Sequence, residues 1–220
     1  MKAKDPLAEA VSRFGATVKA RLSGKAVSGA PEDQLRGPLE VLLQDLVAAL
    51  NFLVADVVAV GESSLADLKT RPDYAVTRQD ALVGFIEGKA PGKGADPRKF
   101  QDKHDREQWE KLKSLPNLIY TDGNAFSLWQ KGAFEIVRLE GSVETAGAAL
   151  AAPKSLLRLF SDFLQWNPIP PKTAMQLAEI TAGLCRLLRD EVAEQMVLGT
   201  KALTDLAMDL AKTAVPRCLG

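Results

Sequence analysis

The run ALVGFIEGKA, residues 81–90, constrains the fold of this chain more than any other segment. It is apolar on both faces until Glu87, which is typical of a central, buried strand. The preceding residues 73–80, DYAVTRQD, are typical of a short strand followed by a polar turn. Together the two segments predict a β-hairpin with three charged side chains, Asp73, Glu87 and Lys89, at one end.

The pattern divides the chain into an α/β body, residues 1–150, and a helical C-terminal segment, residues 151–220. Within the body, near-helical apolar spacing alternates with short β-branched or aromatic runs. After an Ala/Gly-rich connector, SVETAGAALAAP, the spacing is helical only. The elements expected outside the hairpin are helices over 31–53 and 96–115, a strand over 57–62 and three short strands within 117–141.

Composition excludes several classes of site. The chain carries 28 basic and 28 acidic residues, so no overall field draws it to nucleic acid or membrane, and any polyanion site must be a local patch. Cys185 and Cys218 lack a paired spacing, and the single histidine, His104, excludes a His-based metal cluster. Asp5 and Glu9 interrupt the N-terminal run, and no apolar stretch approaches the length of a membrane span, so we expect a cytoplasmic protein without a membrane partner.

The charged end of the hairpin has the composition of a metal site. Side chains two apart on a strand share a face, so Glu87 and Lys89 point the same way, and hairpin pairing brings Asp73 beside Glu87. Two carboxylates at a strand end suit Mg²⁺, for which Mn²⁺ would substitute, and the Gly88 carbonyl could supply a further ligand. Such an ion activates water against a phosphodiester, while the Lys89 ammonium offsets developing charge. A charged triplet at a solvated strand end is the alternative without chemistry.

At these residues the chain resembles a known family. RPDYAV…GFIEGKAPG is similar to the motif of the PD-(D/E)xK nuclease superfamily, in which an aspartate, a glutamate and a lysine in this order bind magnesium and cut DNA. The resemblance covers roughly residues 30–140. It implies a restriction-endonuclease-like fold, a mixed sheet flanked by helices, with Asp73, Glu87 and Lys89 as the catalytic centre.

The resemblance implies two further catalytic residues. PEDQLRGPLEVLL resembles the first helix of nuclease domains fused to N6-adenine methyltransferases, which assigns the helix acid to Glu32, with Glu40 as the alternative. A glutamine that faces the site in these domains is matched by Gln108 in REQWEKL. Related domains often have a tyrosine four residues after this glutamine, where Leu112 stands in this sequence.

Basic residues gather after the hairpin. Lys93 and Arg98 would hold the DNA phosphates that flank the scissile bond, without reading sequence. The alternative is a solvated helix face, because acids alternate with these basic residues.

These features predict a magnesium-dependent DNA endonuclease domain, the cleavage module of a restriction-modification or phage-defence enzyme. The sequence holds no adenine-methyltransferase motif, so methylation and target recognition are expected in other domains or subunits, and a dimer would allow both strands to be cut. The alternatives are a non-catalytic nuclease-fold module for interaction or DNA binding, and a hydrolase of RNA or branched DNA.

Overall fold

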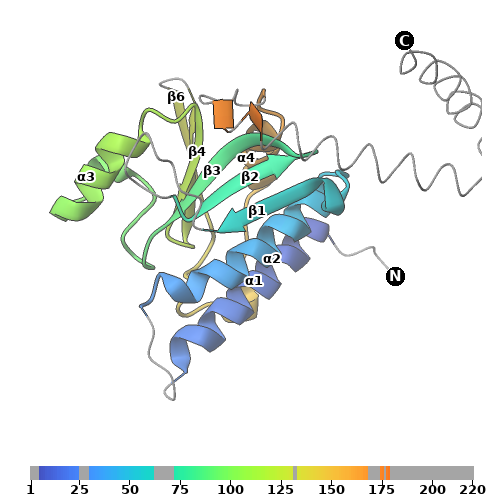
Figure 1. Ribbon diagram of the computed structural model, residues 1–220. Helices are drawn as coiled ribbons and strands as arrows, with labels where there is room; N and C mark the ends of the chain where they lie inside the picture. The colour runs from blue at the N-terminus through green and yellow to red at the C-terminus, as the bar shows by residue number, and fades with distance from the viewer. Residues whose placement is uncertain are drawn as a thin grey trace, which may run out of the picture. The chain divides into compact units, whose positions relative to one another are not determined.

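A computed structural model (Figure 1) describes residues 5–24, 30–61, 72–130, 133–167, 174–175 and 177–178. The chain divides into two compact units, residues 1–170 and 171–220, so the boundary expected after residue 150 falls inside the first unit. Most of the C-terminal helical pattern lies outside the described residues, of which 174–175 and 177–178 are helical. Within the described ranges, no helix is both long and apolar enough to cross a membrane.

Six strands form one mixed sheet, in which neighbours along the chain are also neighbours in space. The β3–β4 pair is parallel, and the other four pairs are antiparallel. A parallel pair requires a long crossover, which here contains helix α3 (Lys103–Leu112). The strands are β1 (Val57–Gly61), β2 (Tyr74–Arg78), β3 (Ala81–Gly88), β4 (Asn117–Thr121), β5 (Ala125–Gln130) and β6 (Ala133–Arg138).

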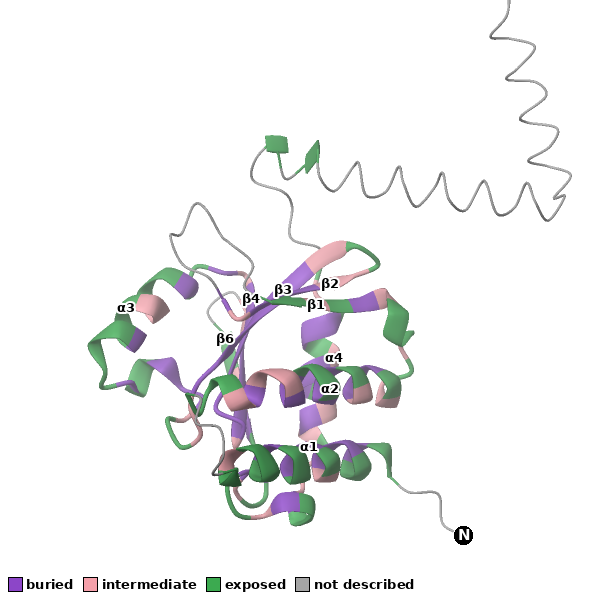
Figure 2. Cartoon of the chain, turned by 60° about the horizontal axis from the view of Figure 1, so that its bottom comes forward, coloured by how far each residue is buried: buried purple, intermediate pink, exposed green. Residues whose placement is uncertain are grey.

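Helices cover both faces of this sheet. A large buried cluster joins one face to α1 (Pro6–Ser23), α2 (Asp33–Ala49) and α4 (Ser155–Leu164), and a smaller cluster joins the other face to α3 (Figures 1 and 2). Ile86 of β3 lies in the large cluster and its neighbour Phe85 in the small one, as strand alternation requires. The structure confirms the predicted fold class, a mixed α/β sheet flanked by helices that is consistent with a restriction-endonuclease-like fold.

The predicted hairpin is formed by β2 and β3. Its turn consists of Gln79 and Asp80, whose φ angles of 51° and 61° lie in the left-handed region. Tyr74 pairs with Ile86 across the hairpin. The residues that precede β2 therefore lie beside the end of β3, and β3 is a central strand, as the sequence predicts.

Three helices differ from the expectation, and the first is α2, which ends at Ala49 and not at residue 53. Helix α1 was not predicted from the sequence, although Asp5 caps this helix by accepting a backbone hydrogen bond from its first turn. The helix expected over 96–115 is divided: a short 3₁₀ turn, η3 (Pro97–Lys99), comes first, and Asp102 then caps α3 by accepting the Asp105 N–H.

The packing of β3 against β4 and α4 generates a prediction about Gly84. A Cβ atom there would lie 2.9 Å from the main-chain oxygen of Asn117 and 2.4 Å from a ring carbon of Phe163. We expect Gly84→Ala to lower the free energy of unfolding by about 1–3 kcal/mol, the usual cost of overpacking. Urea denaturation followed by circular dichroism measures this loss.

Gly61→Ala is the matched control, because a Cβ at this position on β1 lies 4.0 Å or more from every atom of the described residues beyond its chain neighbours. Its free energy of unfolding should stay within about 0.5 kcal/mol of wild type. An equal loss in both variants would mean that the effect comes from the glycine backbone and not from packing.

Candidate functional site

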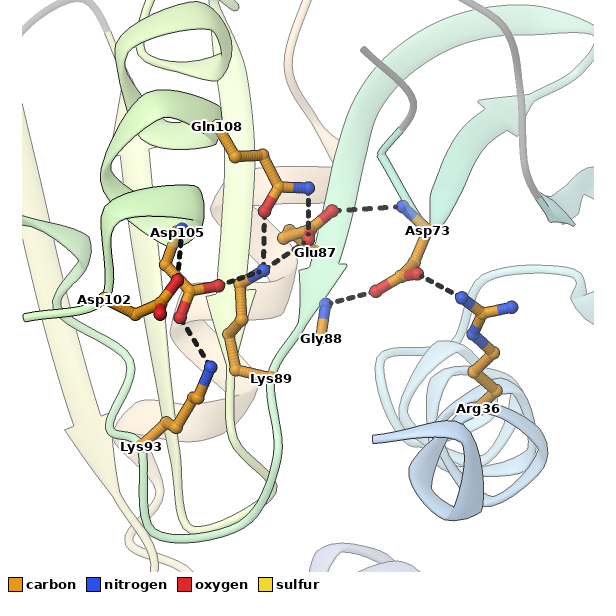
Figure 3. A network of polar contacts seen from close by, with 9 residues as sticks. All are labelled: Arg36, Asp73, Glu87, Gly88, Lys89, Lys93, Asp102, Asp105 and Gln108. Carbon is orange, nitrogen blue, oxygen red and sulfur yellow. Dashed lines mark hydrogen bonds and ion pairs between the residues drawn. The ribbon is translucent and has the colours of Figure 1, made fainter. Parts of the chain in front are cut away.

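Five predicted site residues meet at the end of the hairpin (Figure 3): Asp73 precedes β2, Glu87 and Gly88 end β3, Lys89 follows, and Gln108 lies on α3. The Asp73 N–H donates to Glu87 Oε2 at 3.2 Å. The Gly88 N–H donates in turn to Asp73 Oδ2 at 2.7 Å. Backbone hydrogen bonds therefore fix both carboxylates relative to the hairpin.

Lys89 lies at the centre of the polar network. Its ammonium contacts Glu87 Oε1 at 3.0 Å, Gln108 Oε1 at 2.5 Å and Asp105 Oδ1 at 3.2 Å. The Gln108 Nε2 donates to the same Glu87 oxygen at 2.8 Å, so Glu87, Lys89 and Gln108 form a closed ring. Only 4% of the Glu87 side chain and 6% of the Lys89 side chain is exposed, so this ion pair is almost completely removed from water.

Two members of the network are absent from the sequence-based prediction. Arg36 of α2 donates to Asp73 Oδ1 at 2.9 Å, and Asp105 of α3 contacts Lys89. Asp105 stands three residues before Gln108, a spacing that places both on one face of a helix, so the sequence carried a signal for it. Arg36 has no comparable signal, because its contact depends on how α2 packs against the hairpin.

Within the described residues, neither candidate helix acid forms a hydrogen bond or ion pair with Asp73 or Glu87. Glu32 is exposed at the N-terminal end of α2, immediately before its first residue. Glu40 is exposed as well, but it lies near Tyr74, the residue after Asp73: burial and then the Glu40 carboxylate raise the pKa of the Tyr74 hydroxyl. Of the two acids, Glu40 is therefore the one that acts electrostatically on the neighbour of Asp73. The assignment of Glu32 or Glu40 as the helix acid of the site stays a prediction.

The two residues expected to hold phosphates both pair with carboxylates. Lys93 contacts Asp105 Oδ2 at 2.5 Å. Arg98 donates to Asp96 through Nε at 2.8 Å and Nη2 at 2.9 Å, and its guanidinium lies 4.0 Å from the ring centre of Phe134. The side chains of Lys93 and Arg98 are 43% and 48% exposed, so each remains accessible to a ligand from solvent.

Burial and neighbouring charges shift the pKa values of the central pair. Burial, followed by the Asp73 carboxylate, raises the pKa of Glu87 from 4.5 to about 7, against the opposing effect of Lys89. Burial alone would lower the pKa of Lys89, but Glu87 and Asp105 outweigh it and raise that pKa above its ordinary value. Lys89 is therefore an ammonium at neutral pH.

The oxygen donors at this site fit a hard divalent cation. A carboxylate oxygen has two lone pairs. Asp73 Oδ2 and Glu87 Oε2 each accept one hydrogen bond from a backbone N–H, which leaves one lone pair on each oxygen for a ligand. A cation there would also offset the repulsion that raises the pKa of Glu87. Among the described residues, no three His, Cys, Asp or Glu side chains are grouped to hold a metal, so water, the Gly88 carbonyl or substrate would complete the shell, as is usual for Mg²⁺.

The Tyr120 hydroxyl is a buried polar group next to this network. Tyr120 pairs with Glu87 in the β3–β4 register, and in the described part of the chain its hydroxyl has no hydrogen-bond partner. Burial, then Glu87 and Asp105, raise the pKa of Tyr120, so it stays protonated. Leu112, which stands where related domains have a tyrosine, lies in the same buried cluster.

No family model matches the sequence, and no curated protein matches it. Among solved structures, the chain is similar to part of the cryo-EM structure of the DrdV–DNA complex, with 19% sequence identity and a TM-score of 0.48. The match covers 73% of this chain and 14% of that one. At this identity and TM-score, no residue role is carried over from that complex.

The raised pKa of Glu87 makes stability depend on pH. Between pH 4.5 and about 7 the folded protein retains a proton that the unfolded chain has released. The contribution of Glu87 to the free energy of unfolding is therefore complete below about pH 4.5 and is lost as the pH rises through about 7. The measurement is the difference between the free energies of unfolding of wild type and Glu87→Gln, obtained by urea denaturation with a chelator present. We expect this difference to decrease as the pH rises from 4.5 to about 7.

Asp73→Asn provides the matched comparison, because it removes one cause of the raised pKa while keeping the shape of the side chain. In that background the decrease should be smaller. A difference that stays constant from pH 4.5 to pH 7 would contradict a raised pKa for Glu87.

Proposed function

We propose that this chain is a magnesium-dependent DNA endonuclease domain of the PD-(D/E)xK type, the cleavage module of a restriction-modification or phage-defence enzyme. The observation that carries the proposal is the meeting of Asp73, Glu87, Lys89 and Gln108 at the end of a central hairpin, where Glu87 and Lys89 are buried and the other two are half-buried. Desolvating an ion pair often costs more than the pair returns in stability, which favours a chemical role over a structural one. The same residues carry the sequence resemblance.

Each member of the set has a distinct role. Asp73 and Glu87, with the Gly88 carbonyl, would hold Mg²⁺, which when bound polarises a phosphate and lowers the pKa of a bound water. Lys89 would offset charge developing on the phosphate oxygens and help to orient the attacking water. Gln108 fixes Lys89 relative to Glu87, and its second amide N–H can donate to a water or a phosphate oxygen.

DNA binding would rest on a few exposed groups. Lys93 and Arg98 would exchange their present carboxylate partners for phosphates beside the scissile bond. Glu32 or Glu40 would assist from α2. Because the chain is neutral overall, its own affinity for DNA should be weak. Target recognition would then fall to other domains or subunits. A dimer would allow both DNA strands to be cut.

A second candidate function is a non-catalytic module of the same fold. The observation that favours it is that the charges of the network are already paired, Asp73 with Arg36, Glu87 with Lys89 and Asp105 with Lys93. Three carboxylates and three cations balance without a metal ion, so the network could serve as structure alone.

Cleavage of supercoiled plasmid tests the enzyme proposal. With Mg²⁺ or Mn²⁺, wild type should produce nicked or linear DNA, and Asp73→Asn and Lys89→Gln should each lower the rate by about 100-fold or more, as loss of a charge-stabilising group does. Glu110→Gln is the control, because this acid on α3 is 64% exposed and outside the network. Equal cleavage by all four proteins would show that the activity comes from elsewhere. RNA and branched DNA in the same assay test the alternative substrates.

Metal titration separates the two candidate functions. Mn²⁺ binding, followed by calorimetry, should be weakened in Asp73→Asn by more than the roughly 10- to 100-fold that loss of a supporting hydrogen bond costs. Glu110→Gln should bind Mn²⁺ as wild type does. A wild-type protein that binds no Mn²⁺ and cleaves nothing would favour the non-catalytic module.

A further inference from the structure

Lys89 is held by two carboxylates, and only Glu87 belongs to the predicted catalytic set. The Lys89 Nζ lies 3.0 Å from Glu87 Oε1 and 3.2 Å from Asp105 Oδ1. The third partner, Gln108, stands three residues after Asp105 on α3 and accepts at 2.5 Å. The crossover helix therefore supplies two of the three partners of this ammonium (Figure 3).

Asp105 is itself firmly placed. Its side chain is 5% exposed, and its two oxygens contact different cations, Oδ1 with Lys89 and Oδ2 with Lys93 at 2.5 Å. Its main-chain N–H donates to the Asp102 cap at 3.1 Å, which fixes the backbone in the first turn of α3. A buried carboxylate without a cation is strongly unfavourable, so Asp105 and its cations hold one another in place.

Glu87 alone is a poor anchor for Lys89 if it also binds a metal ion. A divalent cation beside Glu87 would repel the Lys89 ammonium and offset the attraction of the Glu87 carboxylate. Asp105 is not one of the proposed ligands, so its attraction for Lys89 persists whether or not Glu87 binds the ion.

We propose that Asp105 is a positioning residue of this site, which holds the Lys89 ammonium in place when Glu87 engages a metal ion. The inference rests on the proposed function, since it is the metal that takes Glu87 away from Lys89. Asp105 acts through Lys89 and does not touch the substrate.

A double-mutant cycle tests whether Asp105 acts through Lys89. In single-turnover cleavage at saturating DNA and Mg²⁺, Asp105→Asn should slow wild type by about 10- to 100-fold, the usual effect of losing a supporting partner. In the Lys89→Gln background the same change should alter the residual rate by less than about twofold, because residues that act as a unit are not additive. Glu107→Gln, an exposed acid of the same helix, should cleave as wild type does. An equal slowing in both backgrounds, or no slowing in either, would overturn the proposal.

A second measurement does not depend on activity. Lysine ammonium protons give a resolved NMR signal only when their exchange with water is slow, as in a buried ion pair. The Lys89 signal is identified by its loss in Lys89→Gln. It should be present in wild type with and without Mg²⁺, and in Glu107→Gln. In Asp105→Asn it should disappear when Mg²⁺ is added. The amide spectrum of the same sample reports folding, and Asp105→Glu, which keeps the charge and should keep the signal, replaces Asp105→Asn if that variant unfolds.

The two measurements distinguish failure of the inference from failure of the proposed function. If wild type cleaves nothing but the signal follows the expected pattern, the nuclease proposal fails and the positioning of Lys89 by Asp105 stands. If the signal survives in folded Asp105→Asn with Mg²⁺, the inference fails, whatever the protein cleaves.

Discussion

The buried ion pair between Glu87 and Lys89 determines which groups must surround it at the end of the hairpin. Removing both charges from water costs several kcal/mol for each ion, so the fold must surround them with partners. Gln108 and Asp105 meet this need from α3, and the Asp73 N–H meets it from the start of β2. The parallel β3–β4 pair makes these contacts possible, because the connection between the two strands contains α3 and places it on the face of the sheet to which Glu87 and Lys89 point.

Much of the fold could be predicted from local patterns, and the differences lie where side-chain geometry decides. The central position of β3 follows from a run that is apolar on both faces, and the structure confirms it. The division of the helix over 96–115 follows from two capping aspartates, Asp96 and Asp102, which accept different backbone N–H groups. Composition does not say which aspartate in an acidic stretch will cap. Helix α1 could also have been predicted from local patterns, because its buried positions have helical spacing: Leu7, Ala10, Val11, Phe14 and Val18.

At the site, too, local patterns predicted some residues and missed those that depend on tertiary packing. Strand alternation and hairpin pairing are local, so the sequence could place Asp73, Glu87 and Lys89 together, while Gln108 came from the family resemblance alone. Arg36 joins them only because α2 packs beside the hairpin, a contact between residues 37 positions apart. The pattern predicted the existence of α2 but not which of its side chains faces the hairpin, and this is why Arg36 was missed.

The sequence distances within the network also order its assembly. Asp73 and Glu87 are 14 positions apart, Lys89 and Gln108 are 19 apart, and Arg36 and Asp73 are 37 apart. Closing a short loop loses less chain entropy than closing a long one, so the hairpin can form while α2 and α3 are still undocked. At that stage Asp73, Glu87 and Lys89 are already close together, but Arg36, Asp105 and Gln108 have not yet joined them. The complete network is then among the last features that the folding chain acquires, so a nascent or partly unfolded molecule carries the residues of the candidate site without their assembled geometry.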